Sequence, residues 1–432
     1  MFTVIYSMKI RWNFKALDIV LFPFTLCGCT IRKSIVVFVF IFIIVLILSR
    51  KWNVVCSNRD VDIIIEHLCN DVEEGRAIGG LCREFCQPSV LKPVQCQAWH
   101  GGKEIVFKAE FHGNSVYVKG RRTNAYENSE ENLFWRDSDD VEHYPTLIEF
   151  KEIVKSHLFH NFNLTFSETV FYKLWPHPLH RDSMSDEQNR LLLKISLETY
   201  WNLLQDPEYV FLALYEHFDI FPELFGTCGG LYIVEAVTPL NVPGLLEKTS
   251  FTSWAERVKV SLSILDLLDE FDTMFEYPLH ICDVKLEHFG LSDNGRMKYN
   301  DVDNVYLKPV LDKYIADGSD CTKHSDCDFF DCKGQCDLIK RKCLGGVVNN
   351  NLQIVCDKIF MGKSFGLKSL GGTGLLASRH GDGVLKPLLE SCSNPSRAQD
   401  GVRLRAEGQI YTDLRSTLKE IVRARNRLSQ EN

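Results

Sequence analysis

The sequence predicts an α+β fold of two lobes that follows a single N-terminal transmembrane helix. Three observations predict it. Residues 34–49 form an apolar stretch flanked by Arg and Lys. Residues 103–119 then alternate like a pair of β-strands joined by a tight turn. Finally, a long amphipathic helix expected over 253–275 leads the chain into a β-hairpin that lies between two acidic motifs.

The bulk composition describes a folded protein with disulfides. A chain of 432 residues is long enough for two domains, or for one large domain with appendages. Hydrophobic content of 45% and charged content of 25% are ordinary for a globular protein. The net charge of -8 argues against a nucleic-acid partner, because such proteins usually present a basic face. Sixteen Cys is a high number and indicates an oxidising compartment.

The apolar run from Ile35 to Leu48 predicts a membrane anchor. It is shorter than the roughly 20 residues that usually cross a bilayer, but Ser34 and Ser49 extend it and the flanking cations can snorkel. The excess of Lys and Arg before the run favours a cytosolic N-terminus. A cleaved signal peptide is the alternative, although no small-residue cleavage site follows the run. The sequence therefore predicts a single-span type II membrane protein with a lumenal body.

Two features agree with a lumenal body. All the Cys except Cys27 and Cys29 follow the apolar run, and Asn163-Leu164-Thr165 is an N-glycosylation sequon. Residues 50–97 are dense in Cys, which predicts that cross-links stabilise this segment. A zinc site is the alternative, and it is less favoured because the segment has no Cys-x-x-Cys pair. The Cys of this segment are Cys56, Cys69, Cys82, Cys86 and Cys96.

The two acidic motifs after the amphipathic helix carry most of the chemical information. In Ile-Cys-Asp-Val-Lys-Leu-Glu-His, Asp283 is placed like the kinase residue that orients the attacking hydroxyl, and Lys285 like the one that steadies the transferred phosphoryl group. In Asn-Asp-Val-Asp, Asp301 is placed like the kinase metal ligand. The turn Ser-Asp-Asn-Gly at 292–295 predicts a hairpin between the motifs.

A lysine upstream fits the nucleotide side of such a site. Lys119 ends the second of the two strands expected at 103–111 and 115–119, which is where kinases place the Lys that holds the nucleotide phosphates. A solvated strand-end lysine is the alternative. The preceding His100-Gly101-Gly102-Lys103 is a candidate phosphate-covering loop, although it lacks the full Gly-x-Gly-x-x-Gly pattern.

Further nucleotide-site residues are expected on two other elements. A helix predicted over 145–158 is the natural source of a carboxylate partner for the lysine, with Glu149 as first choice and Glu152 as second; each is alternatively a surface carboxylate. The apolar strand at 231–237, which contains Glu235, matches the strand that leads into a kinase hinge, where adenine binds.

The fold class expected for the whole chain is an α+β, bilobal protein-kinase-like fold with disulfide-rich additions. Cysteines crowd the region after the second acidic motif, so a disulfide-rich cap is expected to replace or clamp the activation segment. The expected parts are a cytosolic tail (1–33), a transmembrane signal-anchor (34–49), a Cys-rich lumenal segment (50–97), an N-lobe with a helical insert (98–238), a C-lobe with the Cys-rich cap (239–360), and a Gly-rich linker with a C-terminal helix (361–432).

Together these features resemble the divergent protein-kinase domain 1 family, whose members are Cys-rich type II membrane proteins of the endoplasmic reticulum with a kinase-like lumenal domain. The resemblance implies that Lys119 is the nucleotide lysine, Asp283 the catalytic Asp and Asp301 the metal Asp. It favours the endoplasmic reticulum over the Golgi. The motifs that carry it lie at 79–86, 282–285, 301–303, 325–332 and 349–353.

Three departures from the family pattern bear on activity. His288 stands where kinases place an Asn that holds the second Mg²⁺, and imidazole is a poorer ligand for a hard cation. One metal therefore suffices, or Mn²⁺ substitutes, or catalysis is weak. Cys282 replaces the Arg that reads activation-loop phosphorylation, so control by that route is not expected. The insert at 182–198 lacks the EF-hand pattern, and no calcium site is predicted.

The leading hypothesis is a lumenal kinase that uses ATP with Mg²⁺ or Mn²⁺ to phosphorylate a hydroxyl on a secretory-pathway protein or glycan. A pseudokinase that binds a nucleotide or a partner is the alternative, favoured by His288, which is assigned to the metal site, and by the weak Gly-rich loop. A metal-dependent glycosyltransferase is the third hypothesis, because Asp301-Val302-Asp303 is also an Asp-x-Asp motif. The hairpin between the acidic motifs is not expected in that class.

Overall fold

The structure is a computed structural model. It describes residues 57–100, 104–120, 133–139, 142–175, 177, 185–240, 254–315, 318–362, 374–376, 383–395, 405–406 and 408–430, together with positions 38, 39 and 42. The chain divides into two compact units, Met1–Val55 and Cys56–Asn432, of which the second is described below.

The expected membrane anchor belongs to the first unit. Apart from the three positions named above, the segment 34–49 lies outside the described residues. Among the helices that are described, none combines the length and the apolar composition needed to cross a bilayer. The membrane anchor therefore stays a prediction.

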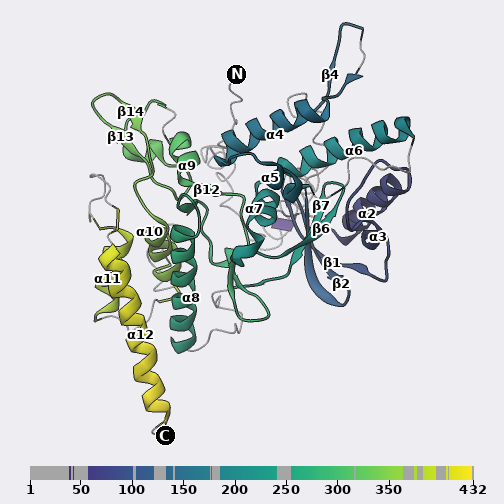
Figure 1. Cartoon of the computed structure of the whole chain (residues 1–432). Coiled ribbons are helices and arrows are strands. Elements are labelled where there is room, and N and C mark those ends of the chain that lie inside the picture. The colour runs from purple at the N-terminus through teal and green to yellow at the C-terminus, as the bar shows by residue number, and fades with distance from the viewer. Residues whose placement is uncertain are drawn as a thin grey trace, which may run out of the picture. The chain divides into compact units, whose positions relative to one another are not determined.

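A five-stranded antiparallel sheet forms the framework of the N-terminal half, with strand order β1-β2-β3-β7-β6 (Figure 1). The strands are β1 (Leu91–His100), β2 (Glu104–Phe111), β3 (Asn114–Gly120), β6 (Leu224–Cys228) and β7 (Leu231–Glu235). The strands predicted at 103–111, 115–119 and 231–237 are thus confirmed. β1 had not been predicted, and the expected domain boundary at residue 98 falls inside it.

The two faces of this sheet have different neighbours. Val116 and Val118 share a buried cluster with Val61 and Phe85, which belong to the helices α2 (Asn58–Glu73) and α3 (Cys82–Phe85). Because side chains alternate along a strand, Lys119 projects from the opposite face. The disulfides Cys69–Cys86 and Cys82–Cys228 confirm that cross-links hold the Cys-rich segment, and the second one joins α3 to β6.

A helical insert separates β3 from β6. It contains α4 (Leu147–Phe162), α5 (Glu168–Leu174), α6 (Asp186–Leu204), α7 (Pro207–Tyr215) and the short turn η3 (Glu216–Phe218), and is preceded by the small hairpin of β4 (Trp135–Arg136) and β5 (Glu142–His143). Phe150, Phe171 and Tyr200 interlock at the centre of the insert with ring centroids 5.1–6.3 Å apart. The helices predicted around 145–158 and 188–204 are confirmed as α4 and α6.

The predicted hairpin between the acidic motifs is present. The elements of this region are β8 (Thr238–Pro239), α8 (Trp254–Thr273), β9 (Leu279–Ile281), η4 (Leu286–His288), β10 (Phe289–Leu291), β11 (Met297–Tyr299) and β12 (Val305–Leu307). β10 and β11 pair antiparallel, and Gly295 turns the chain with φ +82°. A Cβ on Gly290 would lie 2.9 Å from the Thr238 carbonyl oxygen, so only glycine lets β8 approach β10 this closely.

The Cys-rich cap predicted after the second motif is also present. It comprises α9 (Lys308–Ile315), η5 (His324–Cys327), β13 (Gln335–Asp337) and β14 (Lys342–Leu344). Cys321–Cys336 and Cys327–Cys343 cross-link the cap internally, while Cys282–Cys332 joins it to the first acidic motif. The cap is therefore covalently attached next to Asp283.

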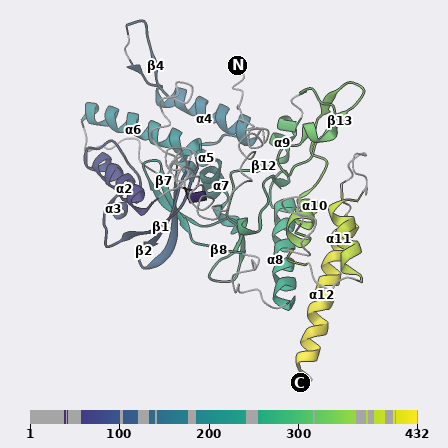
Figure 2. The same cartoon turned by 180° about the vertical axis from the view of Figure 1, so that it is seen from behind.

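Two of the C-terminal helices, α10 and α12, pack on the long helix α8, and both views show α12 running beside it (Figures 1 and 2). The elements are α10 (Asn351–Val355), the π-helical turn η6 (Cys356–Phe360), α11 (Leu385–Ser393) and α12 (Gly408–Gln430). The hydroxyl of Tyr411 donates to the Leu265 carbonyl at 3.1 Å, and Arg415 pairs with Asp266. The helix predicted at 411–428 is confirmed as α12.

Candidate active site

His288 connects the two acidic motifs. Its Nδ1 lies 2.9 Å from the carbonyl oxygen of Asp283, and its Nε2 lies 3.1 Å from Oδ2 of Asp301. The backbone N–H of Asn300 donates to the carbonyl of His288 at 2.7 Å, which fixes the start of the second motif against the end of the first. The hairpin thus returns Asp301 to the neighbourhood of Asp283, as the sequence predicts.

Lys285 and Asp283 form a pair that reaches solvent. Nζ of Lys285 lies 3.0 Å from Oδ2 of Asp283, and the two side chains are 48% and 26% exposed. Partial burial would lower the pKa of Lys285, but the hydrogen bond and charge of Asp283 and the charge of Asp301 outweigh it and raise this pKa. The lysine is therefore a cation beside a carboxylate that an acceptor hydroxyl can approach.

Lys119 lies beside the second acidic motif. Its Nζ is 2.5 Å from Oε1 of Glu208 and donates to the carbonyl of Asn300 at 3.2 Å. Asn300 immediately precedes Asp301, so this hydrogen bond brings the Lys119 ammonium next to the backbone of the metal-site candidate. The structure thereby brings together Lys119, Asp283, Lys285, His288 and Asp301.

The expected pairing of Lys119 with Glu149 is wrong. Glu149 is exposed at the start of α4, where its carboxylate accepts the Thr146 N–H at 2.8 Å in a capping box. Glu152, the second choice, pairs with Lys155 at 3.0 Å on the surface. Helix capping explains Glu149 and a local ion pair explains Glu152, and neither residue contributes to the lysine site.

Glu208 was missed because it opens a helix that had not been predicted. Asp206 caps α7 by accepting the Glu208 N–H at 3.0 Å, and Pro207 occupies the first turn. The hydroxyl of Tyr232, the β7 partner of Lys119 in the sheet, donates to Asp206 at 2.9 Å. The sequence Asp-Pro-Glu before an apolar run was the available signal for this helix start.

The Lys119–Glu208 pair is buried and ionic. Burial would lower the pKa of Lys119, but the charges of Glu208, Asp303 and Asp301 outweigh it and raise this pKa above its usual value. Burial raises the pKa of Glu208 to about 7, against the opposing effect of Lys119 and with the help of Asp206. Burial thus opposes the charge on both groups, and their mutual attraction offsets that cost.

Glu235, expected near the adenine, has a different immediate partner. It ends β7, and its Oε2 accepts from Nζ of Lys298 at 2.7 Å and from the Glu223 N–H at 3.1 Å. Lys298 belongs to β11, so this ion pair ties the sheet to the hairpin that carries the acidic motifs. The Glu235 carboxylate therefore has a structural role, linking β7 to β11. The backbone of Glu235 leads directly into β8.

Asp301 is a candidate ligand for one divalent cation. Its carboxylate is 37% exposed, and Asp303, a second acidic residue, follows two residues on. Mg²⁺ sites in phosphoryl-transfer enzymes use one or two carboxylates together with substrate phosphates and water. Nε2 of His288 contacts the same carboxylate, and His288 is the residue expected at the position where kinases have the amide ligand of a second ion.

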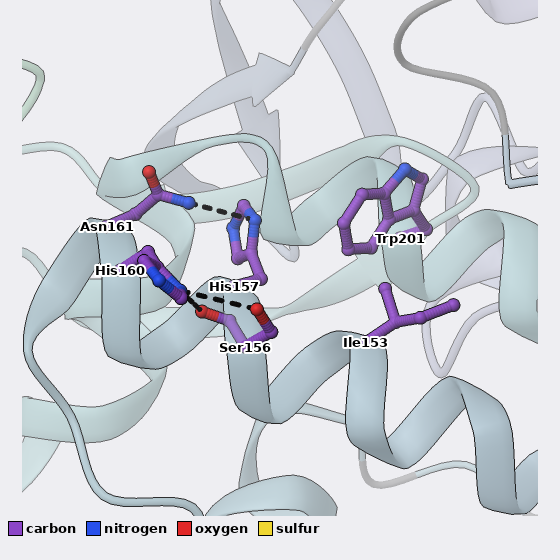
Figure 3. A pocket seen from close by; sticks show the side chains of 6 residues that line it. All are labelled: Ile153, Ser156, His157, His160, Asn161 and Trp201. Atoms are coloured by element: carbon purple, nitrogen blue, oxygen red, sulfur yellow. Dashed lines mark hydrogen bonds between the residues drawn. The ribbon is translucent and has the colours of Figure 1, made fainter. Parts of the chain in front are cut away.

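A separate cavity of about 340 Å³ lies between α4 and α6 (Figure 3). His157 and Trp201 contribute to its lining with Ile153, Ser156, His160 and Asn161. Nε2 of His157 contacts the Leu204 carbonyl at 3.0 Å, and Nδ1 contacts the Asn161 amide at 3.0 Å, so internal hydrogen bonds occupy this ring. None of the predicted site residues lines this cavity.

Comparison with known families gives two matches. Residues 27–174 match the family described as the N-terminal cysteine-rich, endoplasmic-reticulum part of FAM69. Residues 200–395, which include both acidic motifs, match the family described as the protein-kinase domain of FAM69. The two matches cover most of the chain and agree with the kinase-like, disulfide-rich fold. The chain therefore belongs to the FAM69 family and carries its kinase-like domain.

Proposed function

We propose that this protein is a phosphotransferase that moves the γ-phosphoryl group of ATP to a hydroxyl of a secretory-pathway protein or glycan. The observation that supports this most directly is the contact of His288 with both Asp283 and Asp301. This contact supports a single site for a candidate proton acceptor and a candidate metal ligand, and phosphoryl transfer depends mainly on such positioning and on charge neutralisation.

The proposed step uses the described side chains. Asp283 orients the acceptor O–H and takes its proton as the oxygen forms a bond to the γ-phosphorus. The bond between that phosphorus and the bridging oxygen breaks, and ADP leaves with the electron pair. Lys119, held by Glu208, binds the donor phosphates, and Lys285 balances charge on the transferred group. A Mg²⁺ or Mn²⁺ ion held by Asp301 would supply further neutralisation of phosphate charge.

We further propose that the site faces the lumen of the endoplasmic reticulum behind a type II anchor. The N-terminal family match carries an endoplasmic-reticulum description. Disulfides persist in oxidising compartments, and one of them flanks the catalytic loop. The sequon Asn163-Leu164-Thr165 follows the last turn of α4, with Thr165 exposed, so a glycosyltransferase of the lumen can reach it.

The test is transfer of labelled phosphate by the full-length protein, purified in detergent, with Mn²⁺ or Mg²⁺ and a pool of secretory proteins. We expect Asp283→Asn and Asp301→Asn each to lower incorporation about 100-fold or more. Glu152→Gln, which alters a surface carboxylate paired with Lys155, is the matched control and should behave as wild type. Equal labelling by wild type and Asp283→Asn would overturn the proposal.

One observation favours a pseudokinase as the second candidate function. His288 stands at the position where kinases have the amide ligand of a second metal ion. Its two ring nitrogens instead contact the Asp283 carbonyl and the Asp301 carboxylate. Such a protein keeps the Lys119 nucleotide site and acts through partners. It would show ATP-dependent thermal stabilisation that is lost in Lys119→Met, with no transfer to any acceptor. A metal-dependent glycosyltransferase would instead be stabilised by a nucleotide sugar and not by ATP.

A further inference from the structure

The junction between the cap and the catalytic loop has more contacts than a cross-link requires. Cys282 and Val284 flank the candidate catalytic Asp283, and both are bonded to the cap. The disulfide Cys282–Cys332 joins the two segments, and the Asp331 N–H donates to the Cys282 carbonyl at 2.7 Å. On the other side of Asp283, the Val284 N–H donates to Oδ2 of Asp331 at 2.7 Å.

The Asp331 carboxylate is itself held in place. Nζ of Lys358, from the turn η6, donates to the same Oδ2 at 2.6 Å, and both side chains are largely shielded from solvent. The Asn349 amide donates to the Asp331 carbonyl at 2.9 Å. Hydrogen bonds to an ionised carboxylate are shorter and stronger than neutral ones, especially where water is partly excluded. The contact with Val284 is therefore a fixed point and not a loose surface contact.

The backbone next to Asp331 is strained. Phe330 has φ +52°, a region that bulky residues rarely enter, and its side chain is 61% exposed, so the ring gains little from burial. Phe329 and Cys332 exchange backbone hydrogen bonds at 2.8 and 3.0 Å, which makes Phe330 the first corner of a two-residue turn. Hairpins normally place glycine or asparagine there. Retained strain of this kind is characteristic of functional sites.

We propose that Asp331, held by Lys358, is a positioning residue that keeps the catalytic loop in its working conformation without phosphorylation. Cys282 stands where kinases place the Arg that reads an activation-loop phosphate, and the cap stands where that loop runs. An internal carboxylate, already anchored, thus takes over the ordering that a phosphate supplies elsewhere. This inference rests on the proposed phosphotransferase function, because it assigns Asp283 a working conformation.

The activity test compares two substitutions of one residue. Asp331→Ala removes the acceptor for the Val284 N–H, and we expect kcat to fall about 100-fold while KM for ATP changes little, since Lys119 and Asp301 are untouched. Asp331→Asn keeps an oxygen at that place but loses the charge that Lys358 holds, so kcat should fall clearly less than in Asp331→Ala. Asp328→Ala is the matched control, because Asp328 is a shielded carboxylate of the same cap paired with Lys333 at 3.0 Å. It should leave kcat unchanged.

A second measurement is independent of activity. Hydrogen exchange of the peptide that spans residues 281–288 should be several-fold faster in Asp331→Ala than in Asp328→Ala, because the loop loses an anchor only in the former. Equal exchange in these two variants overturns the positioning role, and so does an equal loss of kcat in the Asn and Ala variants. If the wild-type protein transfers no phosphate, the proposed function fails, while loop exchange still decides whether Asp331 orders the loop.

Discussion

Nε2 of His288 lies 3.1 Å from the Asp301 carboxylate, while Nδ1 of the same ring contacts the Asp283 carbonyl. One buried ring therefore bridges the residue proposed to take a proton and the residue proposed to hold a metal ion. In kinases the corresponding amide binds the second Mg²⁺. With His288 at this position the amide ligand is absent, and the imidazole directly links the two motifs instead.

Replacing this ring with an amide tests its role as a substitute for a metal ligand. We expect His288→Asn to raise the Mg²⁺-supported transfer rate relative to the Mn²⁺-supported rate about tenfold, because an amide oxygen suits the harder cation. Initial rates across a titration of each metal measure this ratio. His288→Ala is the control and should lower both rates. A ratio unchanged from wild type in His288→Asn would show that the ring does not set metal preference.

Substitutions of Glu208 and Glu149 test which glutamate orients Lys119 for ATP binding. Glu208→Gln removes the carboxylate 2.5 Å from Lys119, and we expect ATP affinity to fall about tenfold as the ammonium loses its fixed direction. Glu149→Gln alters only the capping box of α4, which lowers stability slightly and leaves ATP affinity unchanged. ATP-dependent shifts in melting temperature report both effects. Weaker ATP binding in Glu149→Gln but not in Glu208→Gln would favour the pairing of Lys119 with Glu149 that the sequence analysis expected.

His280 predicts a loss of stability in acid. The side chain is buried in β9, and neither ring nitrogen has a hydrogen-bond partner. Burial, with the charges of Arg405 and Lys308 and against that of Asp312, lowers its pKa from 6.5 to about 4. His280 therefore takes up a proton below pH 6.5 in the unfolded chain, but only near pH 4 in the folded chain. Stability is fully present above pH 6.5 and is lost as the pH falls.

Between pH 7.5 and 5 this single group should lower the free energy of unfolding by about 2 kcal/mol. His280→Leu, which cannot take up a proton, should remove that part of the pH dependence. Denaturant unfolding of both proteins at the two pH values measures it. The same acid sensitivity in the variant would mean that the pKa of His280 is the same in the folded and unfolded chains.

Glycosylation of Asn163 tests the proposed lumenal placement. We expect the protein made in the presence of endoplasmic-reticulum membranes to lose apparent mass on treatment with an endoglycosidase, and Asn163→Gln to show no such shift. Asn161→Gln changes a neighbouring asparagine that has no sequon and should keep the shift. A chain whose mobility is insensitive to the glycosidase in all three forms would count against a lumenal body.

The sequence revealed those parts of the site that depend on local chemistry. The Asn-Gly turn fixed the hairpin between Asp283 and Asp301, and the alternating strands placed Lys119 correctly. Glu208 lies 89 residues further along the chain, and a helical insert separates it from Lys119, so no local pattern links the two. β1 was missed because its pairing with β2 is irregular at Pro93 and again at Cys96, which hides the alternation.

Disulfide connectivity was also beyond the sequence, since spacing alone leaves many pairings open. The role proposed for Asp331 followed from its hydrogen bonds to Cys282, Val284 and Lys358, beside the Cys282–Cys332 bond. A carboxylate among many in a Cys-rich stretch gives no sign that it reaches a backbone N–H 47 residues earlier.

The Cys82–Cys228 bond joins positions 146 residues apart and crosses from the N-terminal family match into the kinase-like one. The two matched regions are therefore not separable pieces. A fragment that begins at β1 would expose an orphan thiol at Cys228 and uncover the apolar face on which α2 and α3 rest. Expression of the kinase-like region alone in a reducing bacterial cytosol should yield aggregated material, whereas secretion of a chain that includes α2 and α3 should preserve the bond.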